Sequence, residues 1–198
     1  MREKREVEAI LLAEQDATRR LLTFCALLSS DTGLSEDAVL VVGGSAIELY
    51  TRGAYVSGDV DLVVPDKDRI ASSLRRWGFG KEGRLWVRDD WKLAVDLVGT
   101  YYTGSSTRTR IITTPYGPVR LAAIEDLLVK RLASAKHWRQ RGDLEHAALL
   151  GARFKDSIDW TYARERAKTF DVADLLRALE REIMPGAREE RTKGRPPG

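Results

Sequence analysis

The chain has 198 residues, enough for one well-packed domain or for one domain with a helical appendage. Its 33 basic and 30 acidic residues leave a net charge of +3, which by itself indicates no particular partner. No apolar run approaches about 18 residues, and the start, Met1 to Glu6, is too charged for a signal peptide, so we expect a cytoplasmic protein without a membrane partner.

The first predicted element is one helix over residues 5–30, with an apolar stripe between charged faces. The segment Asp31-Thr32-Gly33 is predicted to end it. Cys25, the single cysteine, falls among leucines of this stripe and has no partner for an internal disulfide bond. We therefore expect Cys25 to be a small buried side chain.

Residues 39–64, VLVVGGSAIELYTRGAYVSGDVDLVV, predict a strand, a tight turn, a helix and a second strand. An uninterrupted apolar run enters Gly43, Gly44 and Ser45, which is typical of a buried strand that ends in a turn. Good helix formers follow at residues 46–52, so the backbone N–H groups of the turn lie at a helix N-terminus. Such groups favour phosphate, which makes Gly43, Gly44 and Ser45 candidate phosphate-binding residues.

The second strand, Asp59 to Val64, carries two acids on one face. The strand period of two puts Asp59 and Asp61 on the same side, whereas Val60 and Leu62 face the other way. Two carboxylates this close repel each other unless a cation lies between them. Asp59 and Asp61 are therefore candidate ligands of a hard divalent cation such as Mg²⁺ or Mn²⁺.

The run Gly44-Ser45, thirteen residues, then Asp59-Val60-Asp61 resembles the signature of the nucleotidyltransferase superfamily, which includes DNA polymerase beta, CCA-adding enzymes and antibiotic adenylyltransferases. The longer form GGSAIELYTRG…SGDVDLVV looks most like the AbiEii-type and MenT-like bacterial toxin nucleotidyltransferases and their uncharacterised relatives. The resemblance covers about residues 39–150. It implies that the glycine-serine turn grips a nucleoside triphosphate, and that the paired carboxylates and a third on a neighbouring strand hold two metal ions.

After this stretch, a helix from Pro65 to Trp77 and a hairpin of strands 84–88 and 92–98 are predicted, with Asp89 and Asp90 in the turn. Asp96 lies among apolar residues in the second of these strands, where a buried acid needs a partner. We expect it to be the third metal ligand, and the alternative is a hydrogen-bonded structural aspartate. By the resemblance, Asp96 also deprotonates the attacking hydroxyl.

Residues 101–118 are predicted to begin as a loop that can reach an acceptor or remain a solvated surface loop. A further hairpin pairs residues 108–113 with 119–121. A helix over residues 123–138 follows, with an apolar face and a flanking face that contains Asp126 and Lys130.

The resemblance implies that a lysine on this helix reaches the triphosphate and that an aspartate begins the next helix, which would be Lys130 and Asp143. Arg131 is an alternative to Lys130 because it is adjacent. Without any chemistry, Lys130 would pair with Asp126, and Asp143 would be the N-cap of a helix that runs to Phe154. His137 and His146 are not expected to bind metal.

Two more helices are predicted at residues 159–170 and 172–183, and they are expected to cap the catalytic core. The predicted organisation is a catalytic core with its N-terminal helix at 1–122, a helical segment at 123–184 and a disordered tail at 185–198. The fold class is α/β, a nucleotidyltransferase fold with a small mixed sheet flanked by helices, followed by the helical segment.

The predicted function is metal-dependent transfer of a nucleoside monophosphate from an NTP to an acceptor hydroxyl. The expected acceptor is tRNA or another RNA, favoured by basic residues with few acids nearby in sequence: Lys130, Arg131, Lys136, Arg139 and Arg141. By resemblance, the protein is a candidate toxin with a cognate antitoxin or regulator as partner. The alternatives are an adenylyltransferase acting on a protein or small molecule, and a non-catalytic nucleotide-binding or antitoxin protein.

Overall fold

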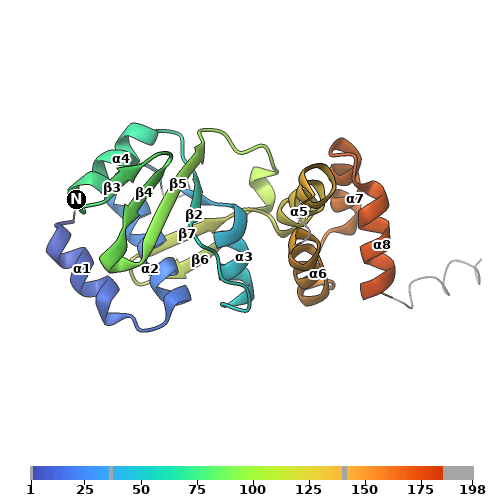
Figure 1. Cartoon of the computed structure of the whole chain (residues 1–198), viewed down its shortest axis with the longest axis horizontal. Helices are drawn as coiled ribbons and strands as arrows, with labels where there is room; N and C mark the ends of the chain where they lie inside the picture. The colour runs from blue at the N-terminus through green and yellow to red at the C-terminus, as the bar shows by residue number, and fades with distance from the viewer. Residues whose placement is uncertain (1, 36–37, 140–141, 185–198) are drawn as a thin grey trace, which may run out of the picture. The chain divides into compact units, whose positions relative to one another are not determined.

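A computed structural model describes residues 2–35, 38–139 and 142–184 (Figure 1). The predicted disordered tail, residues 185–198, lies outside the described residues. The chain divides into two compact units, Met1–Ala123 and Ile124–Gly198, and each is described here by itself. Across the described ranges, no helix combines the length and apolar character needed to cross a membrane.

The first unit is built on a seven-stranded sheet with the strand order β3-β4-β5-β2-β1-β7-β6. The strands are β1 (Leu40–Val41), β2 (Val60–Val63), β3 (Gly80–Glu82), β4 (Leu85–Arg88), β5 (Leu93–Gly99), β6 (Arg110–Thr114) and β7 (Gly117–Leu121). Two of the neighbouring pairs, β2 with β5 and β1 with β7, are parallel, and the others are antiparallel. The sheet is mixed and helices accompany it, so the predicted α/β class is confirmed.

The two predicted hairpins are confirmed, with differences at their ends. β4 pairs with β5 in antiparallel fashion, and a short 3-10 helix, Asp89–Trp91, joins them. β6 pairs with β7 up to Thr114 opposite Gly117, so Pro118 belongs to a strand rather than to the turn. β3 was not predicted, because all three of its residues are exposed and have no apolar alternation to mark them.

The predicted single helix at residues 5–30 was wrong: there are two helices, α1 (Lys4–Ala13) and α2 (Ala17–Asp31). Asp16 separates them, because its side chain accepts a hydrogen bond from the backbone N–H of Arg19, 2.8 Å away, and so caps α2. The intervening residues are compatible with a helix by composition, so the break is a matter of capping rather than propensity. Cys25 is buried on α2, as predicted. Desolvation by burial raises the pKa of its thiol to about 12.

Two further helices complete the first unit: α3 (Gly43–Thr51), directly after β1, and α4 (Lys67–Arg76), after β2. Asp66 caps α4 by accepting a hydrogen bond from the backbone N–H of Arg69. Aromatic rings fill the core between α2, the end of α4 and the sheet: the ring centroids of Phe24 and Trp77 are 6.2 Å apart, and those of Phe79 and Trp91 are 5.7 Å apart. The sheet that carries the acids of the predicted site therefore packs against an aromatic layer.

The second unit is helical in its described part: α5 (Ile124–Trp138), α6 (Gly142–Phe154), α7 (Trp160–Thr169) and α8 (Ala173–Ile183). Its core is formed by buried apolar side chains on all four helices, such as Leu128, Leu150, Ala163 and Leu176. α6 and α8 approach closely at Gly151, where an added Cβ atom would lie 3.0 Å from Cδ1 of Ile183. The predicted helical segment after the sheet is thus confirmed.

Candidate metal centre

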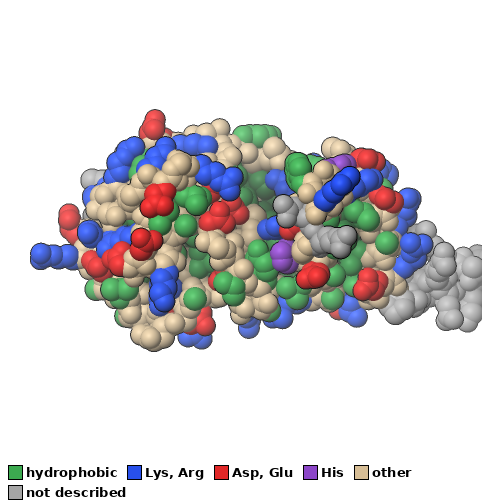
Figure 2. All heavy atoms as spheres, viewed as in Figure 1, with side chains coloured by type: hydrophobic (Ala, Val, Ile, Leu, Met, Phe, Trp, Pro, Cys, Tyr) green, Lys and Arg blue, Asp and Glu red, His purple; other side chains and the backbone are tan. Residues whose placement is uncertain are grey.

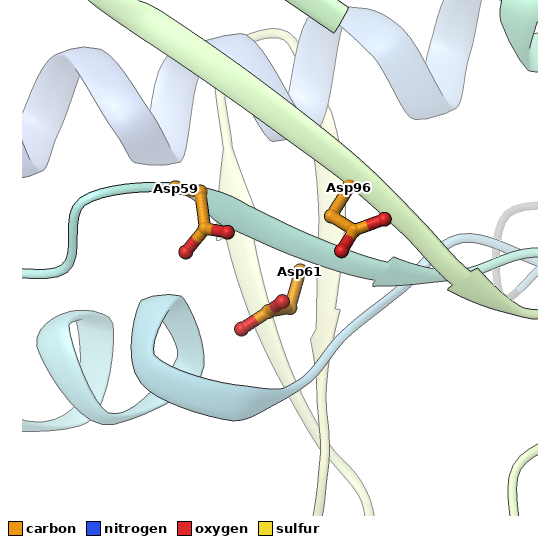
Figure 3. Close-up of side chains that lie close together, drawn as sticks. All are labelled: Asp59, Asp61 and Asp96. Atoms are coloured by element: carbon orange, nitrogen blue, oxygen red, sulfur yellow. The ribbon is translucent and has the colours of Figure 1, made fainter. Parts of the chain in front are cut away.

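Two adjacent parallel strands bring three aspartates together. β2 and β5 are paired with Asp61 opposite Asp96. Asp59 directly precedes β2, and strand alternation places it on the same face as Asp61. Figure 3 shows the three carboxylates turned into one common space. The structure therefore assembles the three acids that the sequence singled out.

The geometry of this cluster suits a cation. One carboxylate oxygen from each of Asp59, Asp61 and Asp96 lies within 4.8 Å of the other two. Asp96 is 6% exposed, whereas Asp59 and Asp61 are half-buried, so solvent reaches the cluster. Three negative charges this close repel one another unless a cation lies between them, and hard cations prefer oxygen ligands. The cluster can therefore hold a metal ion.

The Gly-Gly turn is shaped around Asp61. Gly43 has a φ angle of +57°, and a Cβ atom added to it would lie only 2.0 Å from Oδ2 of Asp61. No side chain fits at that distance, so both the backbone conformation and the close approach require glycine here. The backbone N–H of Gly44 donates to the same carboxylate oxygen, 3.2 Å away. The start of α3 thus orients one of the candidate ligands.

Ser45 has a structural role that its position in the motif does not reveal. Its side chain is fully buried. The hydroxyl donates to the carbonyl oxygen of Val42, 3.0 Å away, and accepts from the backbone N–H of Asp61, 3.1 Å away. The Ser45 hydroxyl therefore links the end of β1 and the start of α3 to the middle of β2 by hydrogen bonds, which we call its fastening role. Because this hydroxyl is already engaged in two hydrogen bonds, a phosphate in this turn would be bound by backbone N–H groups instead.

Arg84 is a neighbour of the cluster that the sequence did not predict. Its Nε lies 3.0 Å from Oδ2 of Asp96, and its side chain is 77% exposed. Arg84 lies at the turn between β3 and β4, next to Leu85, which pairs with Asp96 across the sheet. The predicted hairpin already placed Arg84 at the start of the strand that pairs with the strand of Asp96, which indicated that the two residues could be neighbours. Without the strand register, however, nothing indicated which acid it would meet.

A small pocket opens on the Asp59 side of the cluster. Its volume is about 150 Å³. Its lining combines apolar and charged side chains from four segments of the first unit, among them Leu21, Glu48, Val56, Asp59 and Lys92. Pockets that enclose a whole small ligand usually measure roughly 300–1,000 Å³. This one can receive only part of a bound molecule.

Lys130 lies in the second unit, in a charged network around Asp126. Asp126 is buried and accepts hydrogen bonds from the hydroxyl of Tyr162 at 3.0 Å and from Nε of Arg166 at 2.8 Å. The pKa of Lys130 is lowered, and desolvation is the largest cause. The negative charge of Asp126 opposes that shift, and the positive charge of Arg166 adds to it. The surroundings of Lys130 therefore disfavour its charged form.

Asp143 is not an N-cap, which corrects one of the two alternatives for this residue. α6 begins at Gly142, so Asp143 lies within the first turn of the helix. Its carboxylate accepts a hydrogen bond from Nη1 of Arg131 at 2.7 Å, and Nδ1 of His146 lies 3.2 Å away. Burial raises the pKa of Asp143, but hydrogen bonds from Ser134 and Arg131 outweigh it and leave the pKa below its usual value. Asp143 and Arg131, both predicted to bind the nucleotide, thus form an ion pair with each other.

The basic stretch predicted to bind RNA has acidic neighbours in three dimensions. Besides the Arg131–Asp143 pair, Nζ of Lys136 lies 3.3 Å from carboxylate oxygens of Asp171 and Asp174. Arg141 lies outside the described residues. Figure 2 shows Lys and Arg side chains interspersed with Asp and Glu side chains on the face in view. In three dimensions this stretch therefore also meets acids from α6, from the connection between α7 and α8, and from α8.

Comparison with known proteins provides no assignment. No protein-family model, curated protein or solved structure matches the chain. The function therefore has to be inferred from the residues of the site.

Proposed function

We propose that this protein is a divalent-metal-dependent nucleotidyltransferase that moves a nucleoside monophosphate from an NTP to an acceptor hydroxyl. One observation carries the proposal: the carboxylates of Asp59, Asp61 and Asp96 converge to within 4.8 Å, beside a helix that begins with two glycines. Gly44 and Arg84 already partner Asp61 and Asp96, but a purely structural role gives no reason for three acids to converge. A catalytic metal site, in contrast, uses their mutual proximity.

The residues fit Mg²⁺ or Mn²⁺ because all three ligands are carboxylates and solvent reaches the cluster, which leaves positions for water and phosphate oxygens. Asp59, Asp61 and Asp96 would hold the metal. When bound, it would polarise the phosphate and stabilise the negative charge of the leaving pyrophosphate. The close fit of Gly43 around Asp61 supports this assignment, since it holds one ligand in place before any ion arrives.

In the proposed reaction, the acceptor oxygen forms a bond to the α-phosphorus of the NTP, and the bond from that phosphorus to pyrophosphate breaks. The proton of the acceptor hydroxyl passes to Asp96, the most buried acid of the cluster. The backbone N–H groups in the first turn of α3 are placed to bind the triphosphate, because a helix N-terminus favours anions. The N–H of Gly44 is bonded to Asp61, so the N–H groups of Gly43 and Ser45 are the proposed donors to phosphate. Lys130, Arg131 and Asp143 lie in the second unit, and the proposal that they contact the triphosphate rests on the resemblance alone.

For the acceptor we propose RNA, following the resemblance to RNA-modifying toxins and the basic residues Arg139 and Lys130. Partial neutralisation of Arg131 and Lys136 weakens the electrostatic support for this choice. A protein or small-molecule acceptor is the second outcome that the experiment below distinguishes.

The test incubates the full chain with each labelled NTP, Mg²⁺ and a cell extract that contains RNA, proteins and small molecules, and follows label in each of these three fractions. We expect one discrete RNA to be labelled by the wild type and none by Asp59→Asn with Asp61→Asn, which keeps side-chain size and removes charge. RNA binding should weaken by about 0.7–0.9 log unit per contacted phosphate for each tenfold rise in salt. Label in protein alone would replace the RNA acceptor, and no label with any NTP would reject nucleotidyl transfer.

A further inference from the structure

The ion pair between Arg84 and Asp96 joins an exposed side chain to a buried one. Nε of Arg84 lies 3.0 Å from Oδ2 of Asp96, and the two side chains are 77% and 8% exposed. The arginine therefore extends from the β3–β4 turn to a carboxylate that also belongs to the candidate metal centre. Its guanidinium places a positive charge at the cluster, where a bound metal would also place one.

From this contact we propose that Arg84 and the metal compete for Asp96, and that the displaced guanidinium then binds phosphate oxygens of the nucleotide. This inference rests on the proposed function. A divalent ion approaches a carboxylate oxygen to about 2.0–2.1 Å and carries two charges. It therefore attracts Asp96 more strongly than the guanidinium does, and it repels that guanidinium.

The exposure of Arg84 makes the exchange easy. The pair is exposed on the arginine side only, where solvent screens the guanidinium and holding the long side chain in place costs conformational freedom. The preceding residue, Gly83, has a φ angle of +58°, and an added Cβ would have no heavy atom within 4 Å of it. Arg84 thus leaves an open turn, and its side chain, 77% exposed, has little packing to hold it against Asp96.

The released guanidinium suits phosphate. It keeps its charge, and its fork of N–H donors matches two phosphate oxygens at once. Because the backbone of β4 is paired with β5 at Asp96, the freed side chain stays tethered beside the carboxylates. The phosphates of an NTP bound to those metals would lie in its range. Arg84 would then pair with Asp96 in the metal-free protein and bind phosphate once the metal has displaced it.

The first test measures Mn²⁺ binding without nucleotide, from the electron paramagnetic resonance signal of free Mn²⁺, in wild type, Arg84→Gln and Lys81→Gln. Lys81 is the control: it lies on the same hairpin and its ammonium stacks on Trp86, 5.5 Å from the ring centre. We expect Arg84→Gln to bind Mn²⁺ about two- to fivefold more tightly, because the metal no longer has to displace a solvent-screened guanidinium from Asp96. Lys81→Gln should match the wild type.

The second test measures the affinity for a non-hydrolysable NTP analogue at saturating Mg²⁺. Here Arg84→Gln should bind about tenfold more weakly, because a charged hydrogen bond to phosphate is lost. Arg84→Lys keeps the charge and should recover part of the loss.

If the wild type binds Mn²⁺ and Arg84→Gln binds it no more tightly than Lys81→Gln, competition is rejected while the proposed function stands. If Arg84→Gln binds the analogue as well as the wild type, the phosphate role is rejected. A wild type that binds no Mn²⁺ would overturn the metal centre itself and the competition with it.

Discussion

Asp61 and Asp96 lie directly opposite each other on the adjacent parallel strands β2 and β5. Neighbouring strands are about 4.8 Å apart, and residues in register point to the same face, so the two carboxylates cannot avoid each other. Asp59 adds a third charge two residues earlier on the same face. Arg84 offsets part of the repulsion at Asp96, and a divalent cation would offset more of it.

Mg²⁺ together with an NTP should raise the melting temperature of the wild type. At a ligand concentration of about 100 times Kd the stabilisation is about 2.7 kcal/mol, or roughly 5–10 °C for a chain of this size. Asp59→Asn with Asp61→Asn should abolish the shift and leave the metal-free protein equally or slightly more stable, because the repulsion is relieved. Differential scanning fluorimetry measures both.

The control for that double variant is Asp89→Asn with Asp156→Asn, which removes the same charge from exposed positions outside the cluster. It should keep the full shift. An undiminished shift in the Asp59/Asp61 variant would show that the ligand binds elsewhere.

Gly43→Ala should damage both folding and metal binding. A Cβ atom would lie 2.0 Å from Oδ2 of Asp61, so the carboxylate must move. The positive φ angle adds roughly 1–2 kcal/mol of backbone strain for a non-glycine residue. We expect Mn²⁺ affinity to fall at least about tenfold, as it does when a ligand loses its geometry.

Gly33→Ala separates strain from the clash. Gly33 has a φ angle of +62°, but a Cβ atom there would meet no heavy atom within 4 Å. The free energy of unfolding of Gly33→Ala should fall by about the backbone strain alone, and this variant should bind Mn²⁺ as tightly as the wild type. Equal Mn²⁺ affinity in the two alanine variants would contradict a role for Gly43 in positioning Asp61.

Ser45→Ala should destabilise the protein even when no nucleotide is present. The part-buried backbone N–H of Asp61 would lose its acceptor, which costs about 1–3 kcal/mol. Urea unfolding monitored by circular dichroism gives the free energy of unfolding. Ser72→Ala serves for comparison, because the Ser72 hydroxyl bonds an exposed helix carbonyl and its loss should change stability by less than about 0.5 kcal/mol. Equal stability in both variants would refute the fastening role of Ser45.

Lys130→Ala should weaken nucleotide binding with little loss of stability. Desolvation disfavours the charged form of Lys130, so its removal relieves a cost in the folded state. Isothermal titration with an NTP analogue should show about a tenfold loss of affinity if the ammonium contacts phosphate. Arg131→Ala should instead lower stability, since it leaves the buried Asp143 without its cation. Nucleotide affinity lost only in the Arg131 variant would assign the phosphate contact to Arg131.

The stability contributed by Asp143 should depend on pH. The folded state holds the pKa of Asp143 below its usual value of 3.8, so it favours the charged form. That contribution is present above pH 3.8 and is lost as the pH falls through the lower folded pKa. Asp143→Asn should therefore be less stable than the wild type at neutral pH, by about 1–3 kcal/mol, and the gap should close below about pH 4. A gap that is constant across urea titrations over this range would show that Asp143 does not titrate as an ion pair.

The sequence by itself identified the three carboxylates and the glycine turn of the candidate site. Three features of the site depend only on neighbouring residues and can therefore be predicted from sequence. They are the period-two pattern around Asp59 and Asp61, the isolated acid in the strand of Asp96, and the glycine turn. Hairpins joined by short turns were predictable for the same reason. The helix break at Asp16 was missed because a single capping hydrogen bond decided between two outcomes that have similar propensity.

Only the tertiary structure decided how those residues are connected. The parallel register of β2 and β5 put Asp61 opposite Asp96, and the hairpin that begins at β3 brought Arg84 to the same carboxylate. Ser45 became a buried fastener because β1 and β2 lie side by side, and the basic stretch on α5 met acids from other helices. Strand register and helix packing are set by the burial of many side chains at once, so no single motif records which charged groups they will bring together.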